Sequence, residues 1–300
     1  MNILITGGTG LIGQAFIQQF SDHTFTILTR SIASVNVALP TTVSTIDSLD
    51  KLNNLDAFDA VINLAGEPII DKRWSPKQKN MICQSRWLLT QQLVELFAHS
   101  QKPPSVFLSG SAIGVYGDRG DQTLTESSPV EATDFATRLC LRWEEIAMQA
   151  KPYTRVVLLR TGIVLAAHGG ALKKMLLPFK CFLGGRIGDG QQYMSCIHYQ
   201  DHINAMHFLL LEKSISGAVN LVAPTMQNNS TFTQVLAQSI NRLAFLPVPK
   251  KVLQVLLGES SGLLLDSQKV VPQKLLDSGF SFKFHSLQSA LNDLLTSDLH

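Results

Sequence analysis

The sequence predicts an α/β fold in which a doubly wound parallel sheet is covered by helices on both faces. Three observations support this. Short strands that are apolar throughout alternate along the chain with amphipathic helices, a pattern typical of a parallel sheet buried on both sides. The first strand ends in a glycine-rich turn that opens directly into a helix. Strand signals then become rare after about residue 245, which indicates a small and mostly helical C-terminal region.

Each element is predicted from its own local pattern. Compact apolar or β-branched runs predict strands at Asn2–Thr6, Thr24–Arg30, Asp59–Gly66, Ser105–Ser111, Arg155–Leu165 and Gly217–Ala223. Apolar residues at helical spacing predict helices at Leu11–Phe20, Lys77–Ser100 and Asp134–Gln149. The strands and helices alternate, which is why we expect the strands to be parallel.

Composition excludes several classes of protein. Hydrophobic residues make up 45% of the 300 positions and charged residues 16%, so the chain can bury a sizeable core. The net charge of +2 gives no electrostatic case for binding nucleic acid or an anionic membrane. No apolar run approaches the roughly 20 residues that span a bilayer, and the four cysteines are too far apart to indicate a metal or redox pair. We therefore expect a cytoplasmic protein without a metal site.

The turn after the first strand has the spacing of a phosphate-binding turn, with glycines at positions 7, 10 and 13. This spacing suits a tight turn, a close approach of the backbone to a pyrophosphate, and close packing of helix on strand. The helix N-terminus would offer free N–H groups and a positive dipole end to the phosphates. The flanking strands and helix favour a Rossmann-type dinucleotide site over an unliganded connection. The expected cofactor contacts are Gly7, Thr9, Gly10, Leu11, Ile12 and Gly13.

The end of the second predicted strand favours one dinucleotide over the other. NAD sites usually carry an acidic residue about 20 residues after the glycines, which holds the ribose 2′-hydroxyl. This region has no acid and contains Arg30 instead. Because a guanidinium suits a 2′-phosphate, NADP(H) is favoured as the cofactor. NAD(H) stays open, since the alternative is that Arg30 is a surface residue beside a loop.

These patterns divide the chain into three expected parts. Residues 1–165 form most of an NADP(H)-binding Rossmann domain, whose sheet is completed by strands up to about residue 223. Residues 166–244 hold mixed segments on the substrate side. Residues 245–300 form a small helical C-terminal domain.

Several stretches resemble the extended short-chain dehydrogenase/reductase superfamily, whose members include nucleotide-sugar epimerases and dehydratases. They are TGGTGLIG (6–13), INLAG (62–66), VYGD (115–118) and IGDGQQYMSCIHYQD (187–201). NLAGEPIIDKRW (63–74) and LLDSQKVVPQKLLDSGFSF (264–282) are similar to one branch, the "epimerase family" with a small C-terminal domain of its own. The resemblance covers essentially the whole chain.

The resemblance implies further site residues and a partner. Asn63, Leu64, Ala65 and Gly66 would lie beside the cofactor ribose, and Arg160, Thr161 and Gly162 would approach the nicotinamide. A homodimer would form through the helices at 77–100 and 134–149, as is common in the superfamily.

The usual acid–base residues of the superfamily are missing. They are a Ser or Thr and a Tyr-x-x-x-Lys pair, whose spacing puts tyrosine and lysine on one helix face. The lysine lowers the pKa of the phenol and holds the nicotinamide ribose, so the tyrosine can act as an acid or base. The expected helix, DFATRLCLRWEEIAMQA, contains neither residue. The positions of tyrosine, lysine and serine are filled by Ala136 or Thr137, Cys140 or Leu141, and Ala112.

Other residues are candidates for the missing chemistry. Tyr116, Glu67 and His198 are candidate acids or bases; the alternatives are a packed tyrosine, a loop-capping glutamate and a structural histidine. Candidate substrate contacts are Lys72, Arg73, Trp74 and Gln192, although a solvated loop also explains the first three. The sequence thus predicts an NADP(H)-binding oxidoreductase or epimerase-like protein for a small molecule of unknown identity. The alternative is a non-catalytic NADP(H)-binding sensor or interaction protein.

The choice of cofactor can be tested at Arg30. NADPH should bind more tightly than NADH, because the guanidinium would pair with the 2′-phosphate. Arg30→Asp should remove most of that preference, at a cost of about 1.5–3 kcal/mol for the charged contact. Titration of the unmodified protein and the variant with both nucleotides measures this, and equal affinities in the unmodified protein would contradict it.

Overall fold

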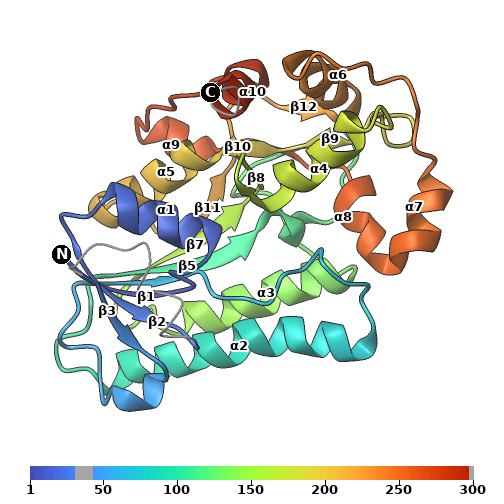
Figure 1. Ribbon diagram of the computed structural model, residues 1–300. Helices are drawn as coiled ribbons and strands as arrows, with labels where there is room; N and C mark the ends of the chain where they lie inside the picture. Colours follow the sequence, from blue (N-terminus) through green and yellow to red (C-terminus); the bar gives the residue numbers. More distant parts are fainter. Residues whose placement is uncertain (31–42, 297–300) are drawn as a thin grey trace.

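The computed structural model describes residues 1–30 and 43–296. A seven-stranded sheet of parallel neighbours lies at the centre, in the order β11-β7-β5-β4-β1-β2-β3 (Figure 1). The strands are β1 (Asn2–Thr6), β2 (Thr24–Leu28), β3 (Val43–Ile46), β4 (Ala60–Asn63), β5 (Val106–Ala112), β7 (Arg155–Thr161) and β11 (Gly217–Leu221). The chain winds outward in both directions from β1 and β4. This confirms the predicted doubly wound fold, in which ligands bind where the strand order reverses.

Helices cover both faces of this sheet. On one face lie α1 (Leu11–Gln19) and α5 (Tyr199–Leu211), and on the other α2 (Pro76–His99) and α3 (Phe135–Met148) (Figure 1). Neighbouring residues of a strand point to opposite faces. Ile3 therefore belongs to the same buried cluster as Phe16 of α1, while Leu4 joins Phe97 of α2. The continuous apolar strands of the sequence are explained by this double burial.

Three short strand pairs lie outside the main sheet, in the part of the chain that the structure describes. The pairs are β8 (Ile163–Ala166) with β10 (Cys196–His198), β9 (Tyr193–Met194) with β12 (Gln227–Asn228), and β6 (Thr123–Leu124) with β13 (Lys269–Val270). The single strand predicted at 155–165 is broken at Gly162. A Cβ on Gly162 would collide with the carbonyl oxygen of Ser195, so only glycine lets the two chain segments cross here. Beyond the break, β8 leaves the main sheet and pairs with β10.

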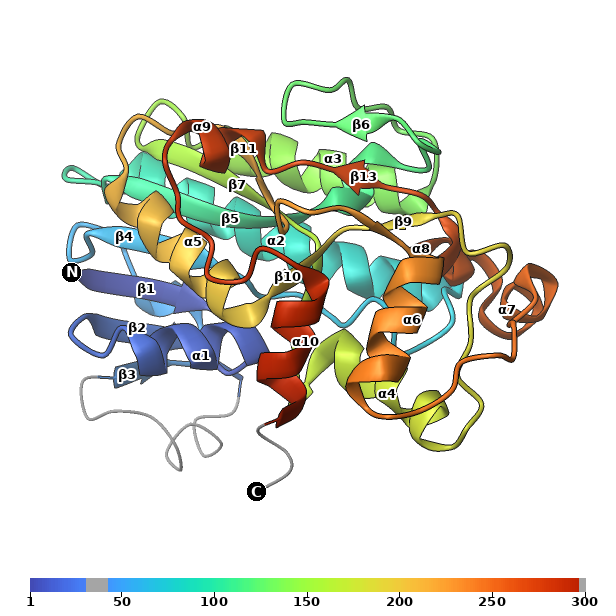
Figure 2. The ribbon, with the colours of Figure 1, turned by 90° about the horizontal axis from the view of Figure 1, so that it is seen from above.

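The C-terminal region is mostly helical, as predicted. It consists of α7 (Lys250–Leu257), a 3₁₀ turn η4 (Gly258–Ser261), α8 (Gly262–Leu265), the strand β13, α9 (Gln273–Asp277) and α10 (Leu287–Thr296). Helix α10 packs beside α4 (Gly170–Lys180) and α6 (Asn229–Ser239), and Leu291 shares a buried cluster with Leu176 and Leu236 (Figure 2). The last segment therefore shares a core with residues 166–244, and the three-part division of the chain stays a prediction.

The long helices α2 and α3 lie against each other under the sheet. Leu88 of α2 is 59% exposed. The homodimer through these helices stays a prediction. In the part of the chain that the structure describes, no helix is both long and apolar enough to cross a membrane.

Candidate functional site

The glycine-rich turn lies at the carboxyl end of β1 and is held against the chain that follows β4. Gly7 has a φ of +71°, and a Cβ there would come within 2.8 Å of the nitrogen of Ala65. A Cβ on Gly13 would collide with the Gly7 carbonyl oxygen, so this glycine lets α1 approach the turn. Gly10 is less crowded, since its Cβ would meet only the Gly7 oxygen, at 3.3 Å. No side chain caps α1 at Gly10, which leaves its first N–H groups available to an anion.

The end of β4 and the residues after it consist of a buried, hydrogen-bonded asparagine and a more exposed segment. Asn63 is buried, accepts a hydrogen bond from Thr6 Oγ1 (2.7 Å) and donates one to Thr90 Oγ1 (2.8 Å). Its side chain therefore ties β1, β4 and α2 together. Leu64 and Ala65 are only partly buried, and Gly66 is exposed. The Asn63 side chain is therefore engaged within the protein, and residues 64–66 are the accessible part of this segment.

The other predicted cofactor contacts lie at different depths. Thr9 and Ile12 are partly buried, and Leu11 is 36% exposed. Arg30 is exposed near the carboxyl end of β2, directly before residues 31–42, which lie outside the described chain. Thr161 Oγ1 lies 3.1 Å from His202 Nε2 on α5. These side chains are brought to the carboxyl edge of the sheet, where ligands of such folds bind.

Arg160 points into the protein and forms a buried ion pair. Its Nε and Nη2 donate to the two carboxylate oxygens of Glu144 on α3, at 2.9 and 2.8 Å. Its Nη1 donates to the hydroxyl of Tyr116 (3.0 Å), which in turn donates to Asn220 Oδ1 (2.8 Å). Ser111 Oγ completes the network by donating to Glu144 (2.6 Å). The guanidinium is thereby committed to neighbours within the core.

Charge and burial in this network explain the ionisation of its members. Burial alone would lower the pKa of Arg160, but the hydrogen bonds and charge of Glu144 outweigh it and raise the pKa. Burial raises the pKa of Tyr116, although the nearby Arg160 opposes this. The phenol of Tyr116 is 2% exposed and stays neutral at physiological pH. Tyr116 thus lies in the interior and not at the surface of a cleft.

Glu67 is held at the carboxyl end of β4 by its backbone. Its N–H donates to Ser85 Oγ (2.9 Å), and its carbonyl accepts from Arg86 Nη1 (3.0 Å), both on α2. The carboxylate lies 3.7 Å from Lys72 Nζ and accepts a long contact from Gln78 Nε2 (3.5 Å). Its side chain is 20% exposed. A positioned carboxylate beside an exposed amine is a suitable arrangement for proton transfer.

The loop that carries Glu67 also contacts the later half of the chain. Trp74 donates its indole N–H to Ile69 and packs edge-on against Phe135 of α3 with ring centres 4.9 Å apart. The Arg73 guanidinium lies beside Gly258. Two ion pairs add to this: Asp71 with Lys174 of α4, and Lys79 with Glu259 of η4. Trp74 therefore acts as a packing residue, while Lys72 and Arg73 are exposed.

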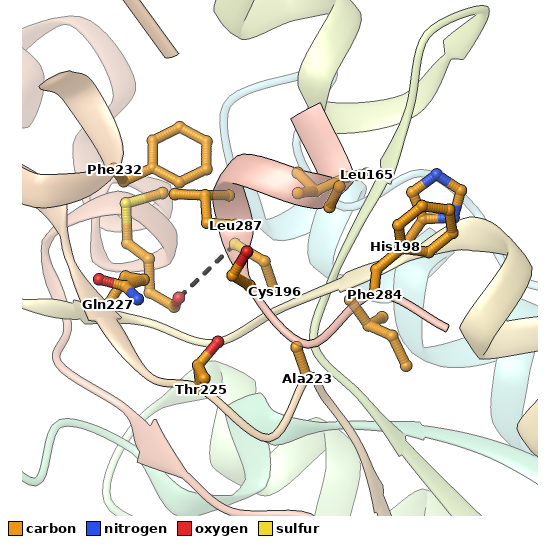
Figure 3. Close-up of a pocket in the computed structure, with 13 residues that line it drawn as sticks. Leu165, Cys196, His198, Ala223, Thr225, Gln227, Phe232, Phe284 and Leu287 are labelled. Carbon is orange, nitrogen blue, oxygen red and sulfur yellow. Dashed lines mark hydrogen bonds between the residues drawn. The ribbon is translucent and has the colours of Figure 1, made fainter. Parts of the chain in front are cut away.

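His198 and Gln192 are both buried. His198 Nδ1 accepts the N–H of Gln200 and so caps α5, while Nε2 lies 3.2 Å from Asp293 of α10. Burial lowers the pKa of His198 to about 4. The histidine stacks on Phe284 and lines a cavity of about 20 Å³, room for a single water molecule (Figure 3). Gln192 donates to the carbonyls of Ile187 and Leu264.

One residue of this region is not anticipated from the sequence. Arg86 projects from α2 toward the end of β4, where a Cβ on Gly66 would come within 2.7 Å of its Cζ. The sequence signal is an arginine at helical spacing from Ile82 and Thr90, on the side of α2 that is buried. Among the described residues, no three His, Cys, Asp or Glu side chains gather as a metal site would require.

Comparison with known families accounts for most of the chain. Residues 3–222 match the model of the NAD dependent epimerase/dehydratase family. The chain belongs to this family. Residues 248–294 match a second model, a domain of unknown function, DUF1731. The two matches agree with the resemblance seen in the sequence, including the separate C-terminal portion.

Individual members of the family are similar over nearly their full length. An epimerase family protein of Staphylococcus aureus strain MRSA252 is 38% identical over 296 residues, which cover 98% of both chains. The crystal structure of human epimerase family protein SDR39U1 (isoform 2) with NADPH is 32% identical, covers 99% of both chains, and has a TM-score of 0.90. UDP-glucuronic acid 4-epimerase from Bacillus cereus, in complex with UDP-glucuronic acid and NAD, has a TM-score of 0.80 at 20% identity and full coverage of both chains. This last likeness shows the fold alone.

Removing one member of the buried pair of Arg160 and Glu144 should destabilise the protein strongly. Glu144→Ala should lower the free energy of unfolding by about 3–5 kcal/mol, because it leaves a buried guanidinium without its counter-charge. Urea denaturation measures this. The double variant Arg160→Met/Glu144→Leu should lose less than Glu144→Ala alone, since no unpaired charge remains. Glu145→Ala, in an exposed ion pair with Arg142, is the control and should cost less than 1 kcal/mol.

Proposed function

We propose that this protein binds NADP(H) and acts as an oxidoreductase or isomerase on a small molecule, with an acid–base group outside the usual Ser-Tyr-Lys set. The observation that carries the proposal is the glycine turn, whose crowded Gly7 and Gly13 leave an open and uncapped helix N-terminus at Gly10. The human family member of known structure is described with NADPH. The exposed Arg30 at the end of β2 supports a 2′-phosphate contact.

The residues at the carboxyl edge fit such a dinucleotide. The first N–H groups of α1 would hold the pyrophosphate, and the backbone of residues 64–66 would lie beside the cofactor ribose. The nicotinamide would supply hydride transfer when bound. The chain's own contribution is then to bind and orient the substrate and to move a proton.

Glu67 is the strongest candidate for that proton transfer. It lies at the carboxyl end of β4, and its carboxylate is accessible while its backbone is fixed by α2. Tyr116 is a weaker candidate for proton transfer, because its hydroxyl is hydrogen-bonded to Arg160 and Asn220 and burial raises its pKa. His198 is also a weaker candidate for proton transfer, since its two ring nitrogens face Gln200 and Asp293.

A second function is favoured by one observation. In the superfamily the chain resembles, two positions of α3 usually carry the tyrosine and the lysine. Here they are filled by Ala136 or Thr137 and by Cys140 or Leu141, and burial raises the pKa of the Cys140 thiol to about 12. A thiol that stays protonated cannot replace a lysine. A non-catalytic NADP(H)-binding sensor would retain the glycine turn without any such group.

Binding can be tested at Gly10. Gly10→Val should abolish NADPH binding, because its branched side chain would occupy the pyrophosphate position, while the melting temperature should change little. Gly13→Ala should instead destabilise the fold, since its Cβ collides with the turn. Fluorescence titration and thermal melts separate the two effects. Unchanged NADPH affinity in Gly10→Val would place the pyrophosphate elsewhere.

The acid–base role can be tested at Glu67. Glu67→Gln should lower turnover about 10²- to 10⁴-fold in a screen of carbonyl and sugar substrates, with NADPH affinity nearly unchanged. Tyr116→Phe, which removes only a buried hydroxyl, and Glu145→Gln on the surface should keep most of the turnover. Full turnover in Glu67→Gln would exclude the carboxylate. NADPH binding without turnover of any substrate would favour the sensor.

A further inference from the structure

A cavity of about 280 Å³ lies at the first turns of α6. Its walls come from three parts of the chain: one face of α6, Arg186, and residues of the segment 244–247. Ser230, Thr233 and Gln234 form the helix face, because residues three and four apart in a helix are neighbours. None of the described residues that line the cavity belongs to the glycine turn or to the loop after β4. The cavity is therefore separate from the candidate cofactor site.

Hydrogen bonds fix the walls of this cavity. The N–H of Val248 donates to the carbonyl of Arg186 (2.8 Å), and the N–H of Gly188 donates to the carbonyl of Val248 (2.9 Å). The buried Asn229 of α6 accepts the N–H of Ile187 at 2.7 Å through its side-chain oxygen. These bonds hold the segment that carries Arg186 between α6 and the chain that follows this helix. The protein itself thus preorganises the cavity, which lowers the free-energy cost of binding a ligand there.

Two polar groups that line the cavity have no partner within the described chain. The Arg186 guanidinium forms no hydrogen bond, ion pair or ring contact with residues 1–30 and 43–296. Thr233 is only 4% exposed, and among the same residues its hydroxyl has no hydrogen-bond partner. Buried hydroxyl groups are normally hydrogen-bonded, since an unpaired one costs free energy. A ligand with acceptor oxygens would satisfy both groups.

The neighbouring cations are used differently from Arg186. Arg242 donates to the carbonyl of Asn241 (3.2 Å), and its guanidinium lies over the Phe182 ring, 4.8 Å from the ring centre. The side chain of Lys250 pairs with Asp189. No carboxylate is found among the described residues that line the cavity. Its lining therefore carries an uncompensated positive charge, which favours an anion.

The other side of the cavity is apolar. Phe245 is 65% exposed, and it lines the cavity together with Ala244 and Pro247. An aromatic ring offers a flat surface on which a planar group can stack. The guanidinium of Arg186 matches the oxygens of a carboxylate or a phosphate with paired hydrogen bonds. The two sides together suit an oxyanion that is attached to a planar apolar group.

We propose that this cavity binds a small organic anion, in which a phosphate or carboxylate is joined to a planar apolar group. The oxyanion accepts hydrogen bonds from Arg186 and Thr233, and the apolar group packs on Phe245. Both head groups share the chemistry that a guanidinium recognises, so the experiment includes one probe for each. The proposal is independent of NADP(H) binding, because the two sites share no described residue.

Phenyl phosphate and benzoate are the probes, and titration calorimetry on the full chain measures their binding. At least one of them should bind, and about tenfold more tightly than inorganic phosphate or acetate, because the ring adds buried apolar surface. The probe that binds more tightly identifies the head group. If neither probe binds, or if the ring adds no affinity, the proposal is overturned.

Three variants then locate the bound probe. Arg186→Met should weaken its binding about tenfold, as expected for a hydrogen bond to a charged group. Thr233→Val should weaken it about 2- to 10-fold, and Thr233→Ser, which keeps the hydroxyl, should retain more affinity. Arg242→Met is the matched control, because this exposed arginine does not line the cavity, and it should change the affinity less than about twofold. Equal losses in Arg186→Met and Arg242→Met would overturn the proposal.

The Gly10→Val variant separates this cavity from the glycine turn. It is designed to abolish NADPH binding and should bind the probe as the unmodified protein does. Loss of probe binding in Gly10→Val would place the probe at the glycine turn and overturn the proposal. Thermal melts of every variant verify that a loss of affinity is not a loss of folding.

Discussion

The buried ion pair between Arg160 and Glu144 is the constraint on which the carboxyl edge of the sheet depends. It joins β7 to α3, reaches β5 through Ser111, and reaches β11 through Tyr116 and Asn220. Separating the two charges inside the protein costs several kcal/mol, so the pair fixes these elements relative to one another. The same pairing occupies the guanidinium of Arg160, so its hydrogen bonds go to Glu144 and Tyr116 and not to a substrate. The resemblance assigns Arg160 to the nicotinamide, and that assignment stays a prediction; the side chain itself is bonded to Glu144 and Tyr116.

With Arg160 paired to Glu144, the described cations nearest the carboxyl end of β4 come from α2 and from the loop after β4. Arg86 lies beneath Gly66, and Lys72 lies beside Glu67. In the superfamily that the chain resembles, a helix corresponding to α3 supplies the cation and the acid–base group together. Here α3 supplies a buried carboxylate and a neutral thiol, and Glu67 and Lys72 come from the connection between β4 and α2. The absence of the usual tyrosine and lysine from α3 thus goes together with the presence of charged residues in the loop at 66–75.

The fold follows from local sequence patterns because each pattern has a local cause. Double burial makes the strands apolar throughout, and the glycine turn is required by a close approach only a few residues long. Strands such as β9 and β12 were not anticipated, since two residues show no period and their pairing depends on distant contacts. The break at Gly162 has no local sequence signal either, because Ser195 is its cause and lies 33 residues further along the chain.

The sequence predicts which segments come together at the candidate site. It does not predict the direction in which each side chain points. Asn63 and Arg160 do lie at strand ends, but Thr90 and Glu144, which orient them, are on other elements. Tyr116 follows β5 as expected, yet a partner in β11 draws its hydroxyl inward. Arg86 could not be singled out, because its setting arises only when α2, Gly66 and α3 come together.

The loop at 66–75 joins the two halves of the molecule through charges near the surface. Its Asp71 pairs with Lys174, and Lys79 just beyond it pairs with Glu259, with every side chain at least 28% exposed. Such pairs contribute little individually and are screened by salt. Ionic strength therefore becomes a control on how firmly the loop is held against α4 and η4. A ligand that contacts Glu67 or Lys72 would bind to a tighter loop in dilute buffer and to a looser one in concentrated salt.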